Sequence, residues 1–151
     1  MKTILHGLFV VFFFFSILFP VKAQEDVQIE SAKWIAAGPE IQDFDTTLPA
    51  PYFRKSFELP AEVKKATAQV TGVGYFEFYL NGKKVGDHVL DPAFTRYDKT
   101  LKYVEFDVTN YLGKGENAAG AIIGNGFYNI DTESAWSFRF APWRNRQAFI
   151  G

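Results

Sequence analysis

The chain has 151 residues, of which 16 are Lys or Arg, 17 are Asp or Glu and 18% are aromatic. This balance gives no excess of basic side chains for nucleic acid phosphates, which argues against a nucleic acid partner. Because the sequence contains no cysteine, a disulfide bond is excluded, and stability has to come from the burial of apolar side chains.

The N-terminus has the charged, apolar and small-residue regions of a secretory signal peptide. Lys2 precedes an apolar run over residues 4–19, and Ala23 supplies a small residue at the expected cleavage site. The run approaches the roughly 20 residues of a membrane-spanning helix, but a cleaved peptide is favoured over an anchor because Ala23 is well placed and no stop-transfer charges cluster beyond it. We expect cleavage after Ala23 and a periplasmic or secreted protein, in which residues 24–33 form a flexible lead. Cleavage removes two lysines, which leaves 14 basic and 17 acidic residues and a net charge of −3.

The first half of the mature chain predicts short strands separated by proline-rich loops. Residues 32–35 are expected to form an edge strand, and the prolines between residues 38 and 51 indicate a loop. Residues 52–59 alternate between Phe and polar side chains until Pro60, which is typical of a strand with one buried face. Residues 63–73 also have a period of two.

The stretch from Tyr75 to Gly86, YFEFYLNGKKVG, predicts a β-hairpin. Its Asn81-Gly82 pair is the strongest local hairpin signal, because both central residues of a type I′ turn have a positive φ, which Asn tolerates and Gly adopts freely. An antiparallel sheet is therefore expected.

Further short elements follow the hairpin. We expect extended segments or strands at 87–90, 103–108 and 117–123, a break at Pro92, and turns at 109–112 and 124–126. Turn signals at intervals of about 8 to 12 residues are typical of an all-β sandwich. Residues 146–150 resemble the start of another strand with no turn after it. We therefore expect a jelly-roll domain over residues 34–151 that lacks its last strands, as a fragment of a longer protein.

The sequence does not provide a recognisable catalytic or metal-binding constellation. Strand alternation places its carboxylates on different faces. No two of them are placed so that one would have a raised pKa and the other a normal pKa, as a general acid and its partner carboxylate require. The mature chain has one histidine, His88, without a cysteine or a second histidine nearby. No serine lies in a Gly-x-Ser-x-Gly elbow. We assign no catalytic residue, no metal ligand and no cofactor.

Several segments in fixed order resemble the N-terminal β-sandwich of bacterial α-L-rhamnosidases, a glycoside hydrolase family with galactose-binding-like sandwich domains. They are FRKSFEL (53–59), GYFEFYLNGKKVGDHVLDPAFTRYDK (74–99), YVEFDVTNYL (103–112), GEN (115–117) and IIGNGFYN (122–129). The chain departs from the family at Phe94 and Phe127, where Trp is usual. Both rings keep a stacking face but lack an indole N–H donor.

The resemblance implies that the catalysis occurs outside this chain. The family hydrolyses terminal α-L-rhamnose with inversion, using acidic residues in an α-helical barrel downstream of the sandwich. This chain would then be a non-catalytic accessory domain of a secreted α-L-rhamnosidase. Its partners would be a rhamnose-containing carbohydrate and the downstream domains of the same polypeptide.

Two sets of loop residues are candidates for recognition. The first could stack on a sugar ring and bind its hydroxyls, and comprises Phe94, Tyr97, Asn125, Phe127, Tyr128 and Asn129. The second is a loop that contains Trp136, Phe138, Phe140, Trp143 and Arg144. Such loops also suit a docking surface for a following domain, which we favour. A Ca²⁺ ion is conceivable by resemblance to rhamnose-binding sandwiches, but no Asp-rich loop specifies one.

Two other functions remain open on the sequence alone. One is a stand-alone carbohydrate-binding module. The other is the sugar-binding sandwich of a glycoside hydrolase related to β-galactosidases and β-glucuronidases, which also carries an LNG hairpin. The stretch from Val89 to Tyr103 favours the rhamnosidase, because the β-galactosidase type usually has a shorter Gly-rich passage there.

Overall fold

The computed structural model describes residues 32–38 and 49–151. The predicted signal peptide, most of the predicted flexible lead and most of the predicted proline-rich loop lie outside these ranges. The described residues form strands and two short 3₁₀ helices, η2 (Thr109–Tyr111) and η3 (Phe138–Phe140). A search of the described part of the chain finds no helix with the length and hydrophobicity to cross a membrane.

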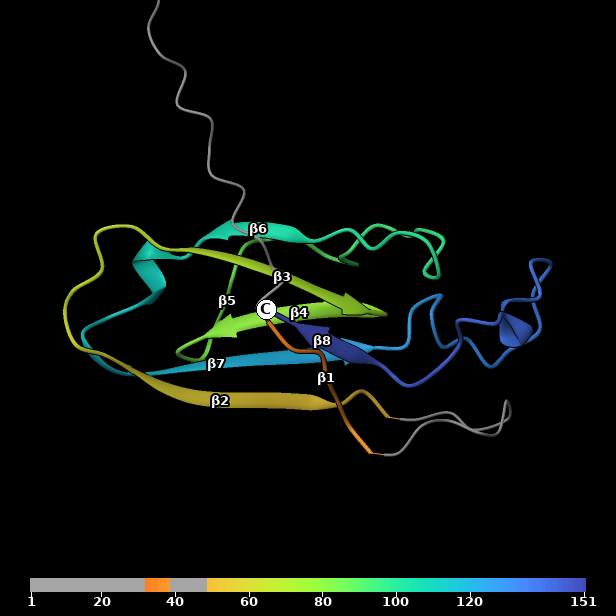
Figure 1. The fold of residues 1–151 in the computed structure, drawn as a ribbon, viewed down its shortest axis with the longest axis horizontal. Helices are drawn as coiled ribbons and strands as arrows, with labels where there is room; N and C mark the ends of the chain where they lie inside the picture. Colours follow the sequence, from red (N-terminus) through yellow and green to blue (C-terminus); the bar gives the residue numbers. More distant parts are fainter. Residues whose placement is uncertain (1–31, 39–48) are drawn as a thin grey trace, which may run out of the picture.

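Two four-stranded antiparallel sheets face each other, as Figure 1 shows. The first has the order β1 (Ile35–Ala36), β8 (Ala148–Ile150), β3 (Thr67–Val73) and β6 (Val104–Asp107). The second has the order β2 (Tyr52–Leu59), β7 (Gly115–Gly124), β4 (Tyr75–Leu80) and β5 (Lys83–Lys84). The expected all-β antiparallel sandwich is confirmed.

The predicted hairpin is present with its expected turn. Strands β4 and β5 pair at Leu80 and Lys83, and the intervening Asn81 and Gly82 have φ angles of 50° and 77°. Positive φ at both central residues is the geometry of a type I′ turn. The local Asn-Gly signal was therefore sufficient to predict this element.

The strand predicted at residues 52–59 matches β2, whereas β3 and β6 are shorter than the alternating segments that predicted them. The extended segment predicted at Asp87–Leu90 is wrong. Gly86 and Leu90 have φ angles of 70° and 58°, which turn the backbone away from an extended path. Only one isolated bridge forms here, in which the Phe76 amide donates to the Asp91 carbonyl at 2.7 Å.

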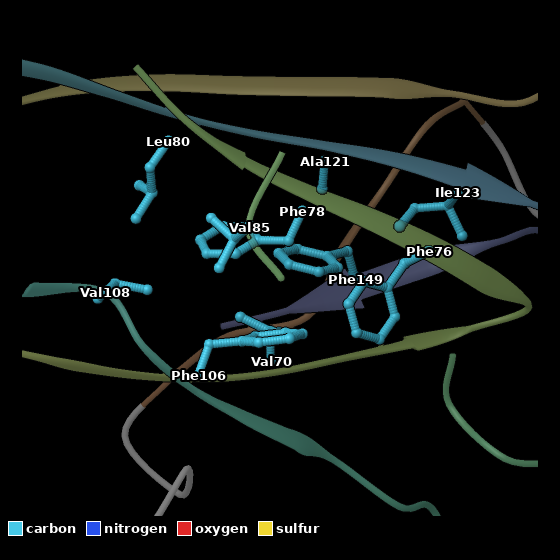
Figure 2. Packing of buried hydrophobic residues seen from close by; sticks show 10 residues of the cluster. All are labelled: Val70, Phe76, Phe78, Leu80, Val85, Phe106, Val108, Ala121, Ile123 and Phe149. Carbon is cyan, nitrogen blue, oxygen red and sulfur yellow. The ribbon is translucent and has the colours of Figure 1, made fainter. Parts of the chain in front are cut away.

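The core lies between the inner faces of the two sheets, as Figure 2 shows. Ile123 on β7 is fully buried, and Val70 on β3 faces the same interior. Phe149 on β8 is stacked with Phe78 at a centroid distance of 6.3 Å and contacts the edge of Phe76 at 5.9 Å. Because Phe149 belongs to one sheet and its partners to the other, these ring contacts join the two layers.

A polar network connects the hairpin turn to the start of β7. The Asn81 amide donates to the Asn117 Oδ1 atom at 2.8 Å, and the Asn81 Oδ1 atom accepts the Ala118 amide at 2.8 Å. The buried Asn117 in turn donates to the carbonyls of Gly113 and Gly115 at 2.7 and 2.9 Å. The asparagines of the LNG and GEN segments therefore bind each other, and the amide of the buried Asn117 is satisfied.

Replacing Ile123 by alanine should lower the free energy of unfolding by about 2–5 kcal/mol, since it removes buried methyl groups and leaves a cavity. Urea unfolding followed by circular dichroism measures the change. The adjacent Ile122 is only partly buried, so Ile122→Ala is the matched control and should cost less. Equal losses in the two variants would contradict the assigned register of β7.

Candidate functional site

Three loops converge at one end of the sandwich, on the side of η3 in Figure 1. Phe94 comes from the loop before β6, Phe127 from the turn after β7, and Phe138 from the segment before β8. The Phe94 ring lies 5.4 Å from Phe127 and 5.5 Å from Phe138, and Phe127 lies 5.9 Å from Phe138. Residues far apart in the sequence therefore form one aromatic surface.

The two sets of aromatic residues predicted separately belong to one cluster. Tyr97 contacts Tyr128 at a centroid distance of 5.2 Å and Trp143 at 6.3 Å. Phe138 contacts both Trp143 and Trp136, at 6.2 and 6.3 Å. We call this the end cluster, which comprises Tyr75, Phe94, Tyr97, Phe127, Tyr128, Trp136, Phe138 and Trp143. Phe140 from the second set lies beside the Arg139 guanidinium, 5.1 Å from its carbon.

The end cluster has an inner and an outer part. Tyr97 is 8% exposed and serves as a small core for the loops. Phe94 and Phe127 are 45% and 40% exposed, and Trp136 is 76% exposed. We define the end patch as these three exposed rings, Phe94, Phe127 and Trp136. Exposed aromatic surface of this kind marks interaction sites.

The two asparagines predicted to bind sugar hydroxyls take part in an internal amide network. The Asn125 Oδ1 atom accepts hydrogen bonds from the Asn129 amide, at 3.0 Å, and from the Gln147 amide. Asn129 and Gln147 are both almost fully buried. This network attaches the turn after β7 to the approach to β8. The part played by Gln147 was missed, because nothing near it in the sequence indicates its partner.

Three buried polar atoms around the end cluster have no hydrogen-bond partner among the described residues. They are the Tyr97 hydroxyl, the Asn129 Oδ1 atom and the Trp143 indole N–H. Buried polar groups in folded proteins are nearly always paired, and because these atoms are inaccessible from the surface, a water molecule inside the cluster is the group that would pair them. The structure thus brings all six predicted residues into one region, and their binding of carbohydrate stays a prediction.

The hydroxyls of Tyr97 and Tyr128 are neutral at physiological pH. Burial raises the pKa of Tyr97 to about 12, with smaller contributions from Tyr75 and Tyr128. Burial also raises the pKa of Tyr128. A phenol that holds its proton donates or accepts hydrogen bonds but does not act as a base. The end cluster is therefore equipped for binding.

Several carboxylates elsewhere in the described part of the chain are engaged in local pairs. A hydrogen bond from Arg96 lowers the pKa of Asp98, and hydrogen bonds from Lys84 and Tyr79 lower the pKa of Glu77. A general acid in glycoside hydrolysis needs a raised pKa, which is the opposite shift. Among residues 32–38 and 49–151, no three His, Cys, Asp or Glu side chains gather as a metal site would require.

Comparison with known proteins identifies the family. The model of the alpha-L-rhamnosidase N-terminal domain matches residues 61–151. The chain belongs to this family. An alpha-L-rhamnosidase of Formosa agariphila is 57% identical over 99 residues, which cover 62% of this chain and 10% of that protein. One from Alteromonas sp. is 38% identical over 103 residues, which cover 65% of this chain and 11% of that protein.

Solved rhamnosidase structures contain the same fold. The enzyme of Aspergillus terreus matches with a TM-score of 0.66 and 26% identity, over 77% of this chain and 13% of that one. The enzyme of Streptomyces avermitilis, solved with L-rhamnose, matches with a TM-score of 0.58 and 32% identity, over 65% of this chain and 9% of that one. The chain thus spans about a tenth of the length of the curated relatives that it matches.

Tyr97→Phe should remove a pH-dependent loss of stability. The folded-state pKa of about 12 exceeds the unfolded value, so the unfolded chain releases this proton first and stability falls as the pH rises from about 10 to 12. Because the hydroxyl has no partner, phenylalanine should be tolerated at pH 7. Urea unfolding at pH 7 and pH 11 measures both effects. An unchanged pH dependence in Tyr97→Phe would contradict burial of the phenol.

Proposed function

We propose that this chain is a non-catalytic accessory domain of an α-L-rhamnosidase, and that its end patch docks onto the rest of that polypeptide. Family membership and the identity to alpha-L-rhamnosidases support the first part. The exposed rings of the end patch support the second. The parent enzyme would release terminal α-L-rhamnose from glycosides or polysaccharides.

The state of three carboxylates supports the non-catalytic role. Inverting hydrolysis requires a protonated and an ionised carboxyl with space for water between them. Glu77, Asp98 and Asp107 all have a pKa below the ordinary value because hydrogen-bond donors stabilise their charged forms. Such groups hold an ion pair or a turn and do not donate a proton near neutral pH.

Docking explains the end patch better than a solvent-exposed role. Trp136 has one ring contact, with Phe138, and most of its surface is exposed. A partner surface would cover the exposed indole together with Phe94 and Phe127, and aromatic rings of this kind are enriched in interface cores. The occupant we propose is the remainder of the rhamnosidase, since matched relatives are about ten times longer than the matched region.

Carbohydrate binding is a second candidate for the same surface. Phe94 and Phe127 meet edge to face at 69°, and each keeps roughly half of its ring exposed. A sugar could place its C–H face on either ring. The amides of Asn125 and Asn129, the predicted hydroxyl ligands, are bonded within the loop network, and this ranks the sugar site below docking.

We also propose that the protein is exported. The charged, apolar and small-residue regions of residues 1–23 support a signal peptide cleaved after Ala23. The absence of cysteine is compatible with an oxidising compartment, in which no thiol would be oxidised.

Trp136→Ala tests docking in the full-length rhamnosidase that contains this domain. Loss of a central interface ring should destabilise the docked enzyme by about 2 kcal/mol, seen as a lower thermal unfolding temperature. The same change in the 151-residue protein should have little effect, because the indole is exposed there.

Tyr103→Ala is the matched control, because Tyr103 is also exposed but lies outside the end cluster. Equal effects of the two substitutions on the full-length enzyme would refute docking. Phe127→Ala distinguishes the second candidate. A loss of rhamnose affinity with unchanged thermal stability would assign the surface to sugar.

A further inference from the structure

A hollow lies on the outer face of the β2-β7-β4-β5 sheet, away from the core. It has a volume of about 330 Å³ and is lined by residues of β2, β7 and β4 together with Gly82. Across this face Arg54 is paired with Gly120, and Gly120 with Tyr79. We call the hollow the β7 groove. It shares no residue with the end cluster, and its volume is in the range of small-molecule sites.

The floor of the β7 groove is low because of Gly120. A Cβ atom at this position would lie 3.5 Å from the Phe53 carbonyl oxygen and 3.9 Å from the Tyr79 Cβ atom, which are ordinary contacts. Its φ is not positive either, so neither backbone conformation nor crowding requires glycine. Glycine inside a strand costs about 0.5–1 kcal/mol relative to alanine and often marks close approach by a ligand.

Two tyrosines form the walls. Tyr52 on β2 is 77% exposed beside Ile122, and Tyr79 on β4 stands across the groove. The Tyr79 hydroxyl donates to Glu77 at 2.5 Å, which fixes the ring orientation. Flat aromatic walls above a floor of small side chains suit a ring with apolar C–H faces, such as a pyranose.

The charges around the groove favour a negative ligand. Lys84 is paired with Glu77 at 2.8 Å, so these two charges cancel. Arg54 makes no ion pair within the described ranges of the chain, although it lines the groove. The planar guanidinium can hold a carboxylate through two parallel hydrogen bonds.

We propose that the β7 groove binds an oligosaccharide that carries an acidic sugar. The pyranose ring would stack on Tyr52, and its carboxylate would bind Arg54. This inference depends on the face of the sheet and not on the end patch, so it can hold or fail independently of docking. It would give a rhamnosidase domain an affinity for acidic, rhamnose-containing polysaccharides.

Isothermal titration of the 151-residue protein with trigalacturonate tests the proposal. We expect binding that weakens with added salt and falls about tenfold or more with the fully methyl-esterified trimer, which has the same rings without the charge. Arg54→Gln should reduce the affinity for trigalacturonate by a similar factor. Gly120→Val should abolish binding, because its side chain raises the floor and β-branched residues are accommodated in strands.

Matched controls separate this site from general charge attraction and from misfolding. Lys55→Gln removes the same charge from the adjacent position of β2, which points to the opposite face, and should leave binding within about twofold. Gly113→Val places the same side chain at a glycine with open space outside the groove. The proposal is overturned if the wild-type protein does not bind, if the ester binds equally well, or if either groove variant behaves like its control.

Discussion

The register between β4 and β7 is the constraint on which both candidate sites depend. Asn81 supports it from the hairpin turn, because its amide donates to Asn117 and its Oδ1 atom accepts the Ala118 amide, while Asn117 donates to the Gly113 carbonyl of its own segment. A shift by one residue would turn every side chain of β7 to the other face. Gly120 would then face the core, and Ile123 would face solvent.

This register also determines which residues of β7 point into the core, which point to the outer face of the sheet, and where the loop after the strand lies. With Ile123 inward, the alternate residues Ala118, Gly120 and Ile122 are directed outward and form the floor of the β7 groove. The strand then ends at Gly124, which places Phe127 and Tyr128 against the loop that carries Phe94 and Tyr97. Both surfaces are thus consequences of one strand alignment, although they are built from different residues.

Local sequence signals predicted those parts of the fold that local geometry decides. The Asn81-Gly82 turn and the alternation in β2 were sufficient, because turn dihedrals and side-chain period are properties of a few neighbouring residues. The segment Asp87–Leu90 was predicted wrongly, since Leu90 has a positive φ. Leucine rarely adopts this conformation, so the residue type did not indicate it.

The candidate site was predicted in pieces for the same reason. Both aromatic sets were recognised, but their merger through Phe138 requires contacts between residues separated by more than 40 positions. Gln147 was missed because its partner, Asn125, is 22 residues away. The groove was missed because nothing in the sequence distinguishes Gly120 from any other small residue of a strand. Its position matters only because strand pairing brings Arg54 and Tyr79 beside it.

We propose that this domain binds and docks, and that bond cleavage takes place elsewhere in the parent protein. Release of nitrophenol from p-nitrophenyl α-L-rhamnoside by the purified 151-residue protein tests this most directly, with circular dichroism of the same sample to verify a β-rich fold. We predict no release above the buffer rate. Release that is lost on heat denaturation would show a catalytic site in this chain and would contradict the account.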